Sequence, residues 1–429
     1  MCDTFVALPN ATTTGTTLLA KSADTEVNEC QVLERLPGRD WPEGAMVRVT
    51  HRLIPQARRT HDCLINKSFW LYGAEIGVNE YGLAIGNEAV FTNNYDRGDG
   101  VNLIDLLRIM LERAASAREA IDVTADLLKE FGQGGNCELR GNSHFDGSFI
   151  VADPNEAWIL ETAGSEWAAK RVADVAAISN LLTIADDWDQ SSLADASGPK
   201  TDFRGRYVEM GPSLESGAPD RLAVSSGYLQ ERAGQVGLRT MADLLRQCPE
   251  DWDPAEGDVA TNICMHAGIN PERLWQATGA MIADCGSDGV MAWFTGTSGT
   301  DISIFKPAFP GVDFPEMGPK PKETYDPAAM WWRHEHLHRR VMTNWPQLAP
   351  EIRSEIELLE DTFFKDAAAI RAAPRTQQEA FLVDCWQRAE DLTEKWIKKL
   401  ESQRLAFANP AYGETWRRLN AAAAFPQPV

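Results

Sequence analysis

The sequence predicts an α+β fold in which two β-sheets pack face to face and helices cover their outer faces. Three observations predict it: residues 1–90 have the spacing of hairpins, residues 101–130 have the helical period, and strand-rich blocks return at 148–184 and 264–305. Strands, then helices, then strands again are what a sheet-on-sheet sandwich with helical outer layers produces. The chain after residue 327 is helical in pattern, which adds a C-terminal helical extension.

The first element is a predicted hairpin. Residues 2–8 form one strand, the threonine-rich residues 12–17 form the turn, and residues 18–24 form the returning strand. Antiparallel pairing brings Lys21 and Asp24 back toward Cys2. A cation beside a thiol lowers the pKa of the thiol, and a carboxylate near an ammonium group holds it. An ordinary surface hairpin with a charged tip fits the same spacing.

The remaining elements of the body follow in order. Further strands are predicted at 46–53, 69–76 and 83–91, between Gly, Pro and Asn signals. Two amphipathic helices are predicted at 101–111 and 117–130, with Ser116 as N-cap and Gly132 as the end of the second. A turn at Asp153 joins two apolar strands of the next block, and hairpins fill the last one.

Three regions follow from these patterns. We expect a catalytic body at residues 1–310, a Pro-rich connector at 311–327 and a helical region at 328–429. Pro346, Pro350 and Pro374 are the expected helix breaks. A stripe of apolar residues, Ile352, Ile356, Leu359 and Phe363, favours packing of this region on the body. A separate helical subdomain or a dimerisation arm, and hence a homo-oligomer, stays open.

The composition is that of a large globular protein. Of 429 residues, 44% are hydrophobic and 24% charged, and no apolar stretch approaches the roughly 20 residues that cross a bilayer. A net charge of -22 opposes binding to nucleic acid or to an anionic membrane. The eight cysteines, at 2, 30, 63, 137, 248, 264, 285 and 385, form no CxxC pair. We expect no disulfide framework, no thiolate zinc site and a reducing, cytoplasmic compartment.

Cys2 is the most informative residue. A small second residue permits removal of Met1, after which a thiol and a free α-amino group lie on the same residue. The α-amino group has an ordinary pKa of about 7.7–8.0, so near neutral pH it can take the thiol proton, directly or through a water. A cysteine at position 2 by accident is the alternative, since one cysteine near a start is a weak motif.

A set of segments carries a family resemblance. They begin with Cys2-Asp-Thr-Phe-Val-Ala-Leu and continue, in order, at 20–24 with Asn28-Glu29, 78–89, 132–136, 148–154, 157–163, 177–180, 263–266, 293–297 and 304–307. Together they resemble the secernin and cysteine dipeptidase family of N-terminal nucleophile (Ntn) hydrolases. The resemblance extends from residue 2 to about residue 340, which makes it more specific than a single motif.

The resemblance implies a four-layer αββα sandwich and hydrolysis of an amide bond, most typically in a dipeptide, with no cofactor and no metal. It implies Cys2 as nucleophile, Asp24 as the carboxylate near its amino group, Lys21 where acyl-amide relatives have Arg, and Asn87 and Asn180 as oxyanion contacts. The family pattern Lys-Asn-Ser-Asp-Arg is replaced here by Lys21-Ser-Ala-Asp-Thr25. Substrate preference and strength of activity therefore stay open. An acyl-amide hydrolase of the penicillin V acylase or bile salt hydrolase type and an inactive, secernin-like scaffold are alternatives.

A competing motif lies in the helical region. The run from His334 to His338 satisfies HExxH, in which two histidines on one helix face could bind zinc and Glu335 could act as base. A zinc site also needs a third ligand, which the sequence does not identify, so a solvated, aromatic-anchored helix is favoured. His51, His61, His144 and His266 are dispersed and are expected to be structural, while Gln133 or Asn136 could lie at the rim of a substrate pocket.

Overall fold

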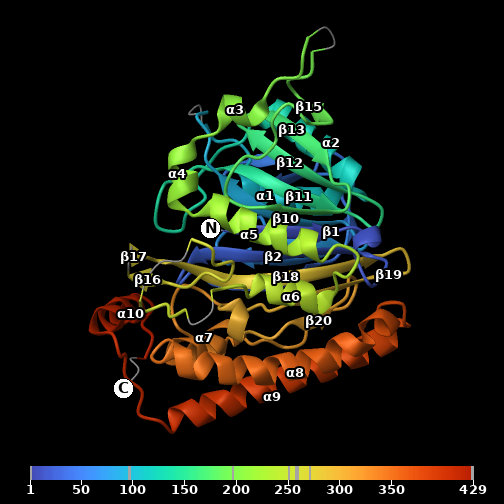
Figure 1. The fold of residues 1–429 in the computed structure, drawn as a ribbon. Coiled ribbons are helices and arrows are strands. Elements are labelled where there is room, and N and C mark those ends of the chain that lie inside the picture. Colours follow the sequence, from blue (N-terminus) through green and yellow to red (C-terminus); the bar gives the residue numbers. More distant parts are fainter. Residues whose placement is uncertain are drawn as a thin grey trace.

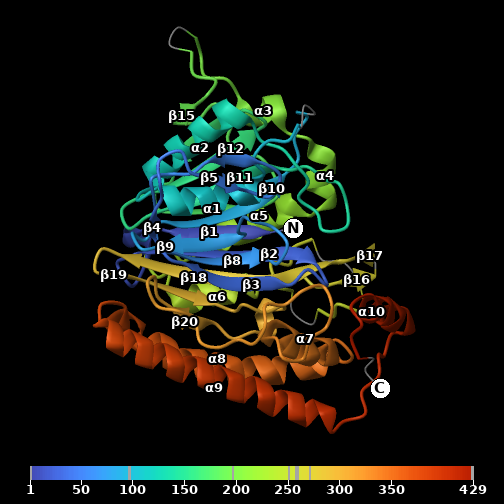
Figure 2. The same ribbon diagram turned by 180° about the vertical axis from the view of Figure 1, so that it is seen from behind.

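The computed structural model describes residues 2–94, 98–195, 198–249, 252–256, 260–269 and 272–426. Two antiparallel sheets lie face to face, with helices α1 and α2 on the outer face of one and α5, α6, α8 and α9 on the outer face of the other (Figures 1 and 2). The predicted α+β, four-layer αββα arrangement is therefore confirmed. Strands such as β1 (Asp3–Ala7), β2 (Thr17–Glu26) and β11 (Asp146–Ala152) are buried at nearly every position, because one face packs in the core between the sheets and the other packs under the helices.

The six-stranded sheet contains the N-terminal hairpin. Its strand order is β14-β1-β2-β18-β19-β20. The strands are β1 (Asp3–Ala7), β2 (Thr17–Glu26), β14 (Val175–Ile178), β18 (Trp275–Gly286), β19 (Gly289–Phe294) and β20 (Lys306–Ala308). The predicted first hairpin is confirmed, because β1 pairs with β2 in a register that sets Asp3 opposite Ser22 and Thr4 opposite Lys21. A short 3-10 helix, η1 (Pro9–Ala11), lies in its connection.

The second sheet has eight strands in the order β15-β13-β12-β11-β10-β9-β8-β3. The strands are β3 (Gln31–Leu36), β8 (Cys63–Ser68), β9 (Ile76–Asn79), β10 (Ala84–Val90), β11 (Asp146–Ala152), β12 (Ala157–Ala163), β13 (Glu166–Arg171) and β15 (Gln190–Ser191). The strand predicted at 69–76 is wrong. Apolar residues occur there, but the chain turns through that segment between β8 and β9.

Three two-stranded ribbons complete the strands. They are β4 (Arg39–Asp40) with β7 (Arg59–Thr60), β5 (Met46–Arg48) with β6 (Leu53–Pro55), and β16 (Gly268–Ile269) with β17 (Glu272–Arg273). The single strand predicted at 46–53 is thus two short strands with a turn between them.

Helices α1 (Leu103–Arg113) and α2 (Ala117–Phe131) cover the eight-stranded sheet. Both were predicted from their apolar period. Ser116 accepts a hydrogen bond from the backbone N–H of Glu119, and Gly132 ends α2 with a φ of 65°, a conformation that favours glycine. Asn102 caps α1 in the same way through Asp105.

Two helices of a segment that the sequence patterns did not predict cover one face of the six-stranded sheet. The segment comprises α3 (Phe203–Tyr207), α4 (Met210–Glu215), α5 (Ala218–Glu231) and α6 (Leu238–Leu245). Helix α5 packs on β1 and β14, and α6 packs on β2 and β18. This segment supplies Arg221, a residue that the functional site depends on.

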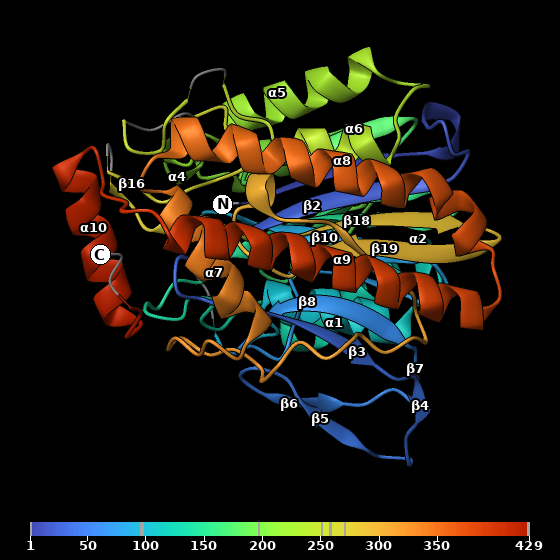
Figure 3. The same cartoon turned by 90° about the horizontal axis from the view of Figure 1, so that it is seen from below.

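The C-terminal region consists of α7 (Met330–Val341), α8 (Trp345–Arg371), α9 (Arg375–Glu401) and α10 (Pro410–Ala422). Helices α8 and α9 run side by side across the sheet (Figure 3). Pro374 separates them as predicted, and Pro346 lies in the first turn of α8. The break predicted at Pro350 is wrong, because α8 continues through it one turn after its start.

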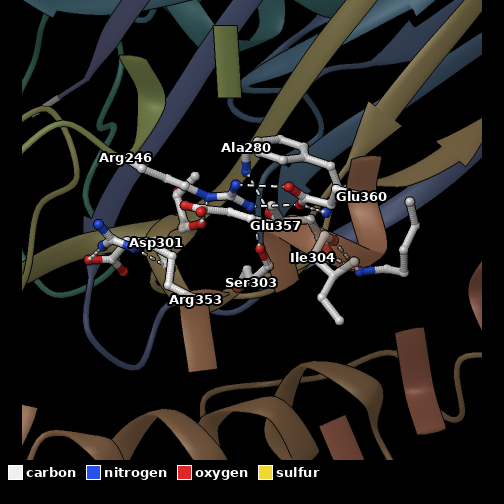
Figure 4. Close-up of polar contacts among 12 residues, drawn as sticks. Arg246, Ala280, Asp301, Ser303, Ile304, Arg353, Glu357 and Glu360 are labelled. Atoms are coloured by element: carbon white, nitrogen blue, oxygen red, sulfur yellow. Dashed lines mark hydrogen bonds and ion pairs between the residues drawn. The ribbon is translucent and has the colours of Figure 1, made fainter. Parts of the chain in front are cut away.

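Ion pairs join α8 to the body (Figure 4). Both guanidinium nitrogens Nη1 and Nη2 of Arg246 bind the Glu360 carboxylate, at 2.8 and 2.6 Å, and the backbone N–H of Phe305 donates to the same carboxylate at 2.9 Å. Arg353 on α8 pairs with Asp301, which lies in the 3-10 helix η2 (Thr300–Ile302), at 3.2 Å. The division into three regions stays a prediction, but these contacts show where the helices attach.

The C-terminal helices also contact the turn after β2. Asn28 donates from Nδ2 to the carbonyl of Leu419 at 3.0 Å and accepts at Oδ1 from Arg339 at 2.8 Å. Arg339 donates to Asn420 as well, at 2.8 Å. Within the described residues, no helix combines the length and apolarity that a bilayer crossing requires.

Candidate active site

A cavity of about 640 Å³ opens beside Cys2. Its walls come from both sheets, from α1, and from the loops after α2, α4 and β14. The residues that line it are Cys2, Asp24, Thr25, Glu29, Glu75, Asn87, Ala89, Phe91, Leu103, Ile104, Cys137, Glu138, Ser143, Phe145, Asn180, Glu215, Ser216, Arg273, Leu274 and Trp275. A cavity of this size with a partly apolar lining suits a small molecule. Of the five predicted site residues, four line it: Cys2, Asp24, Asn87 and Asn180.

The backbone nitrogen of Cys2 is held by a side chain distant in sequence. Its N–H donates to Oδ1 of Asn180 at 2.9 Å. The same oxygen accepts from Nη2 of Arg221 at 2.7 Å, and Nδ2 of Asn180 donates to the carbonyl of Ala89 at 2.8 Å. Two donors on one side and an acceptor on the other fix which way the amide points. Asn180 is therefore placed to hold the nitrogen of Cys2, and the oxyanion contact that the resemblance implied for it stays a prediction.

Arg221 positions this arrangement from α5. It is fully buried, and Nε donates to Oδ2 of Asp3 at 2.9 Å while Nη2 also donates to Oγ of Ser179 at 2.9 Å. The Asp3 charge compensates the guanidinium in a region without water-exposed atoms. Arg221 thus connects Asp3, the residue after Cys2, to Asn180, which holds the backbone nitrogen of Cys2.

The thiol of Cys2 lies in a buried, polar environment. Sγ accepts a hydrogen bond from the backbone N–H of Asp24 at 3.4 Å. Burial raises the pKa of the thiol to about 11, although the nearby Lys21 ammonium acts in the opposite direction. With this pKa the thiol needs a base close by to act as a nucleophile at neutral pH.

Lys21 lies behind the cavity wall and not in it. Its ammonium pairs with Glu75 at 3.1 Å, and both side chains are buried. Burial alone would lower the pKa of Lys21, but the thiol of Cys2 and the carboxylates of Glu75 and Glu88 outweigh it and raise this pKa. Lys21 is therefore charged and acts on the thiol through its field.

Asp24 faces the same cavity. Burial raises the pKa of its carboxyl to about 7, although Arg221 and Lys21 act against this shift. Oδ1 accepts from Ser22 at 3.1 Å. A carboxyl with this pKa changes its charge near neutrality, and a new ammonium group beside it would favour the ionised form.

The two sheets touch directly beneath the site. A Cβ on Gly86 of β10 would come within 2.6 Å of Oγ1 of Thr4 and 3.0 Å of Cγ of Lys21, so only glycine permits this approach. Next to it, Asn87 faces the cavity and donates from Nδ2 to the carbonyl of Ala74 at a long 3.5 Å. Its second N–H remains to serve as a donor to a substrate oxygen.

The sequence patterns did not single out four charged residues at the site: Glu29, Glu75 and Arg273, which line the cavity, and Arg221, which contacts Asn180. Glu29 was named only as part of a segment that carries the family resemblance. The helix that carries Arg221 has a signal, because Pro219 and Asp220 are typical of a first helical turn. No local pattern indicates that its cation reaches Asn180, since that contact joins residues 41 positions apart.

The HExxH motif does not form a zinc site in the described structure. Nε2 of His334 lies 2.9 Å from the carbonyl of Ser298, while Nε2 of His338 faces His266 at 3.4 Å. Glu335 is bound by Arg339 at 2.5 Å and by Nδ1 of His338 at 3.1 Å. The proposed base is thus already paired, and the zinc-peptidase alternative is wrong because the motif is a buried structural cluster.

A group of three potential ligands does occur nearby among the described residues. Cys264, His266 and Asp301 are all buried, with their ligand atoms within 4.8 Å of one another. Nε2 of His266 contacts Asp301 at 2.9 Å, and Arg353 contacts the same carboxylate at 3.2 Å. These contacts account for the group as part of the attachment of α8, and the Arg353 guanidinium beside Asp301 opposes a metal cation there.

Comparison with known proteins finds similarity to peptidases. A family model described as peptidase family C69 matches residues 58–196. A dipeptidase of Bifidobacterium longum (strain NCC 2705) is 28% identical over 228 residues, which is 46% of this chain and 39% of that protein. The matched part of the chain thus spans well under half the length of this relative. These matches show similarity to peptidase family C69 and to a dipeptidase, and they support the resemblance to the cysteine dipeptidase family noted above.

Two solved structures are also similar. The conjugated bile acid hydrolase of Clostridium perfringens, solved as a mutant, has a TM-score of 0.44 and 13% identity, over 72% of this chain and 92% of that one. A Caenorhabditis elegans orthologue of N-acylethanolamine-hydrolyzing acid amidase has a TM-score of 0.36 and 11% identity, over 66% and 92%.

Proposed function

We propose that this chain is an N-terminal cysteine amidohydrolase of the Ntn type, and that it cleaves the amide bond of dipeptides through a thioester on Cys2. The observation that carries the proposal is the position of Cys2: the residue lines a cavity, its nitrogen is held by Asn180 and its sulfur by the backbone N–H of Asp24. A merely structural cysteine has no need for this arrangement. The C69 match and the dipeptidase relative support the choice of substrate class.

The first half of the reaction forms the thioester. After removal of Met1, the α-amino group of Cys2 lies against Oδ1 of Asn180 and takes the thiol proton. The thiolate attacks the carbonyl carbon, and Asn87 donates a hydrogen bond to the oxyanion that develops. The C–N bond then breaks as the α-ammonium gives its proton to the leaving amine.

The second half is hydrolysis of the thioester. The α-amino group, now neutral again, takes a proton from water while the water oxygen attacks the same carbonyl carbon. The C–S bond breaks, the acid product leaves, and the thiol of Cys2 recovers its proton. We expect the enzyme to need no metal and no cofactor, and we expect it to work in the cytoplasm, where its eight free thiols stay reduced.

A substrate panel with variants of Cys2 tests the proposal. Mass spectrometry should show the loss of Met1, and wild-type protein should hydrolyse members of a dipeptide panel. Cys2→Ala should abolish hydrolysis, while Cys2→Ser retains the α-amine and should keep a small residual rate. A chelator should leave the activity intact.

The same panel decides the alternatives. Cleavage of penicillin V or of N-acyl amino acids, with dipeptides untouched, would point to an acyl-amide hydrolase. Full activity of Cys2→Ala would refute the mechanism, and a folded wild-type protein that cleaves none of these compounds would favour a scaffold.

A further inference from the structure

Glu29 is a carboxylate in the cavity wall that the proposed mechanism does not use. It lies in the turn after β2, is 3% exposed and lines the cavity beside Cys2. Its oxygen Oε1 accepts from Oγ of Ser68 at 2.5 Å and from Nε1 of Trp70 at 2.8 Å. Two neutral donors therefore orient the carboxylate, and among the described residues both of its hydrogen bonds go to the same oxygen.

Burial of such a group has an energetic cost that a ligand could offset. Burial raises the pKa of Glu29 to about 7, although the hydrogen bonds from Ser68 and Trp70 oppose the shift. Glu75 adds to it, since its charge raises the pKa of Glu29 as well as that of Cys2. A buried carboxylate held by neutral groups is strongly stabilised by a cation that reaches it.

The other carboxylates of the cavity have different surroundings. Glu75 is paired with Lys21, and Asp24 lies beside the nucleophile. Glu138 is half-buried and Glu215 is exposed. Glu29 itself is buried, and its side chain accepts hydrogen bonds from two neutral donors, Ser68 and Trp70.

The charges of the cavity as a whole favour a cationic ligand. Among its described lining residues five carry carboxylates, Asp24, Glu29, Glu75, Glu138 and Glu215, and one, Arg273, carries a cation. Such a site attracts a positively charged group and opposes an anionic one. A dipeptide brings an ammonium group for the acidic wall and a carboxylate for Arg273.

We propose that Glu29 binds the protonated amino group of the substrate, so that the site selects compounds with a free amine over their N-acylated counterparts. The inference rests on the proposed function and narrows its substrate class. An acyl group removes both the charge and two of the three N–H donors of the ammonium, and would leave the buried carboxylate without a partner.

Binding to an inactive variant tests the inference separately from catalysis. Cys2→Ala protein is titrated calorimetrically with L-alanyl-L-leucine and with its N-acetyl derivative, alone and in combination with Glu29→Gln. Glutamine keeps Oε1 as acceptor for Ser68 and Trp70 but replaces the second oxygen by an amide. The dipeptide should bind about 10- to 100-fold more weakly to the Glu29→Gln protein, with little change for the acetylated compound.

Glu215→Gln is the matched control, because it removes one negative charge from the exposed rim of the same cavity. It should change the affinity for both compounds to the same small extent. Glu29→Asp, which keeps the charge, should retain part of the preference for the free amine, and thermal unfolding of each variant checks its fold.

Three results would overturn the inference: equal weakening of both compounds by Glu29→Gln, no weakening of the dipeptide, or no measurable binding of the dipeptide to Cys2→Ala protein. If the preference for the free amine is present but wild-type protein hydrolyses nothing, the hydrolase proposal fails and the ammonium site stands.

Discussion

Replacing Arg221 by Met separates its contribution to stability from its contribution to catalysis. The side chain is fully buried and paired with an equally buried Asp3 at 2.9 Å. Removing one partner of a buried pair leaves an uncompensated charge, which costs about 3–5 kcal/mol of unfolding free energy. Asn180 also loses a donor to Oδ1 and, with it, part of its hold on Cys2.

The double variant Arg221→Met with Asp3→Asn separates the effect on stability from the effect on turnover. Without the unpaired carboxylate, the remaining loss is that of ordinary hydrogen bonds, about 1 kcal/mol each, so the double variant should be more stable than Arg221→Met alone. Turnover should not recover, because Asn180 still lacks its donor. A misplacement of about 1 Å at a reacting group reduces the rate on the order of 10²-fold.

Urea unfolding and steady-state kinetics on a dipeptide provide the two measurements. Asp3→Asn alone keeps the contact from Arg221 to Asn180 and serves as the control, with most of its turnover retained. The loss in the Arg221 variants should lie in kcat more than in KM, since Arg221 acts through Asn180. If the double variant regains turnover together with stability, Arg221 does not position Asn180 and the reasoning is refuted.

Three other predictions concern the N-terminus, the pH dependence and the C-terminal helices. A glutamate inserted between Met1 and Cys2 should keep Met1 in place; with a thiol pKa of about 11, only about 3 in 10⁴ thiols are then ionised at pH 7.5. Iodoacetamide should alkylate Cys2 at least about tenfold more slowly than in processed protein, and equal rates by mass spectrometry would contradict the role of the α-amine. Burial raises the pKa of Glu161 from an ordinary 4.5 to about 7, so the folded protein holds this proton more tightly than the unfolded chain does. The stability that results is fully present below about pH 4.5 and is lost as the pH rises through 7. Glu161→Gln should remove about 3 kcal/mol of this decline between pH 4.5 and 8 in urea titrations, and an unchanged slope would argue against it. Glu360→Gln should lower the unfolding free energy by about 3–5 kcal/mol, because Arg246 is left buried without its anion. Glu355→Gln, which breaks an exposed pair with Lys395, should cost less than about 1 kcal/mol, and a similar cost for both would contradict the role of Glu360 as an anchor.

Local patterns were enough to predict the elements whose residues carry their own signals. Helix α2 has an apolar face, a serine cap and a terminal glycine, and all three are found where the sequence places them. The first hairpin has its turn chemistry and alternation, and its register follows. The segment at 69–76 has apolar residues without alternation, and there the pattern could not distinguish a buried turn from a strand.

The site was predictable only in part, for a physical reason. Cys2, Lys21 and Asp24 lie on one hairpin, so their proximity follows from strand pairing alone. Asn180 and Asn87 were predicted from the family resemblance alone. The contact that orients Asn180 depends on Arg221, and the sequence pattern of its helix does not indicate that this side chain faces the interior. Residues 334–338 have the complete HExxH spacing, yet Glu335 is paired with Arg339. A spacing rule takes no account of such a contact.

The contacts of Asn28 give the C-terminal helices a part in shaping the cavity. Asn28 is fastened by Leu419 and Arg339, and the next residue along the backbone is the acid Glu29. The helices after the Pro-rich connector therefore hold the loop that carries this acid, although the nucleophile and the strands of both sheets lie outside them. Loss of this hold should impair discrimination among substrates sooner than the capacity to form an acyl intermediate, which would make the last hundred residues a determinant of selectivity.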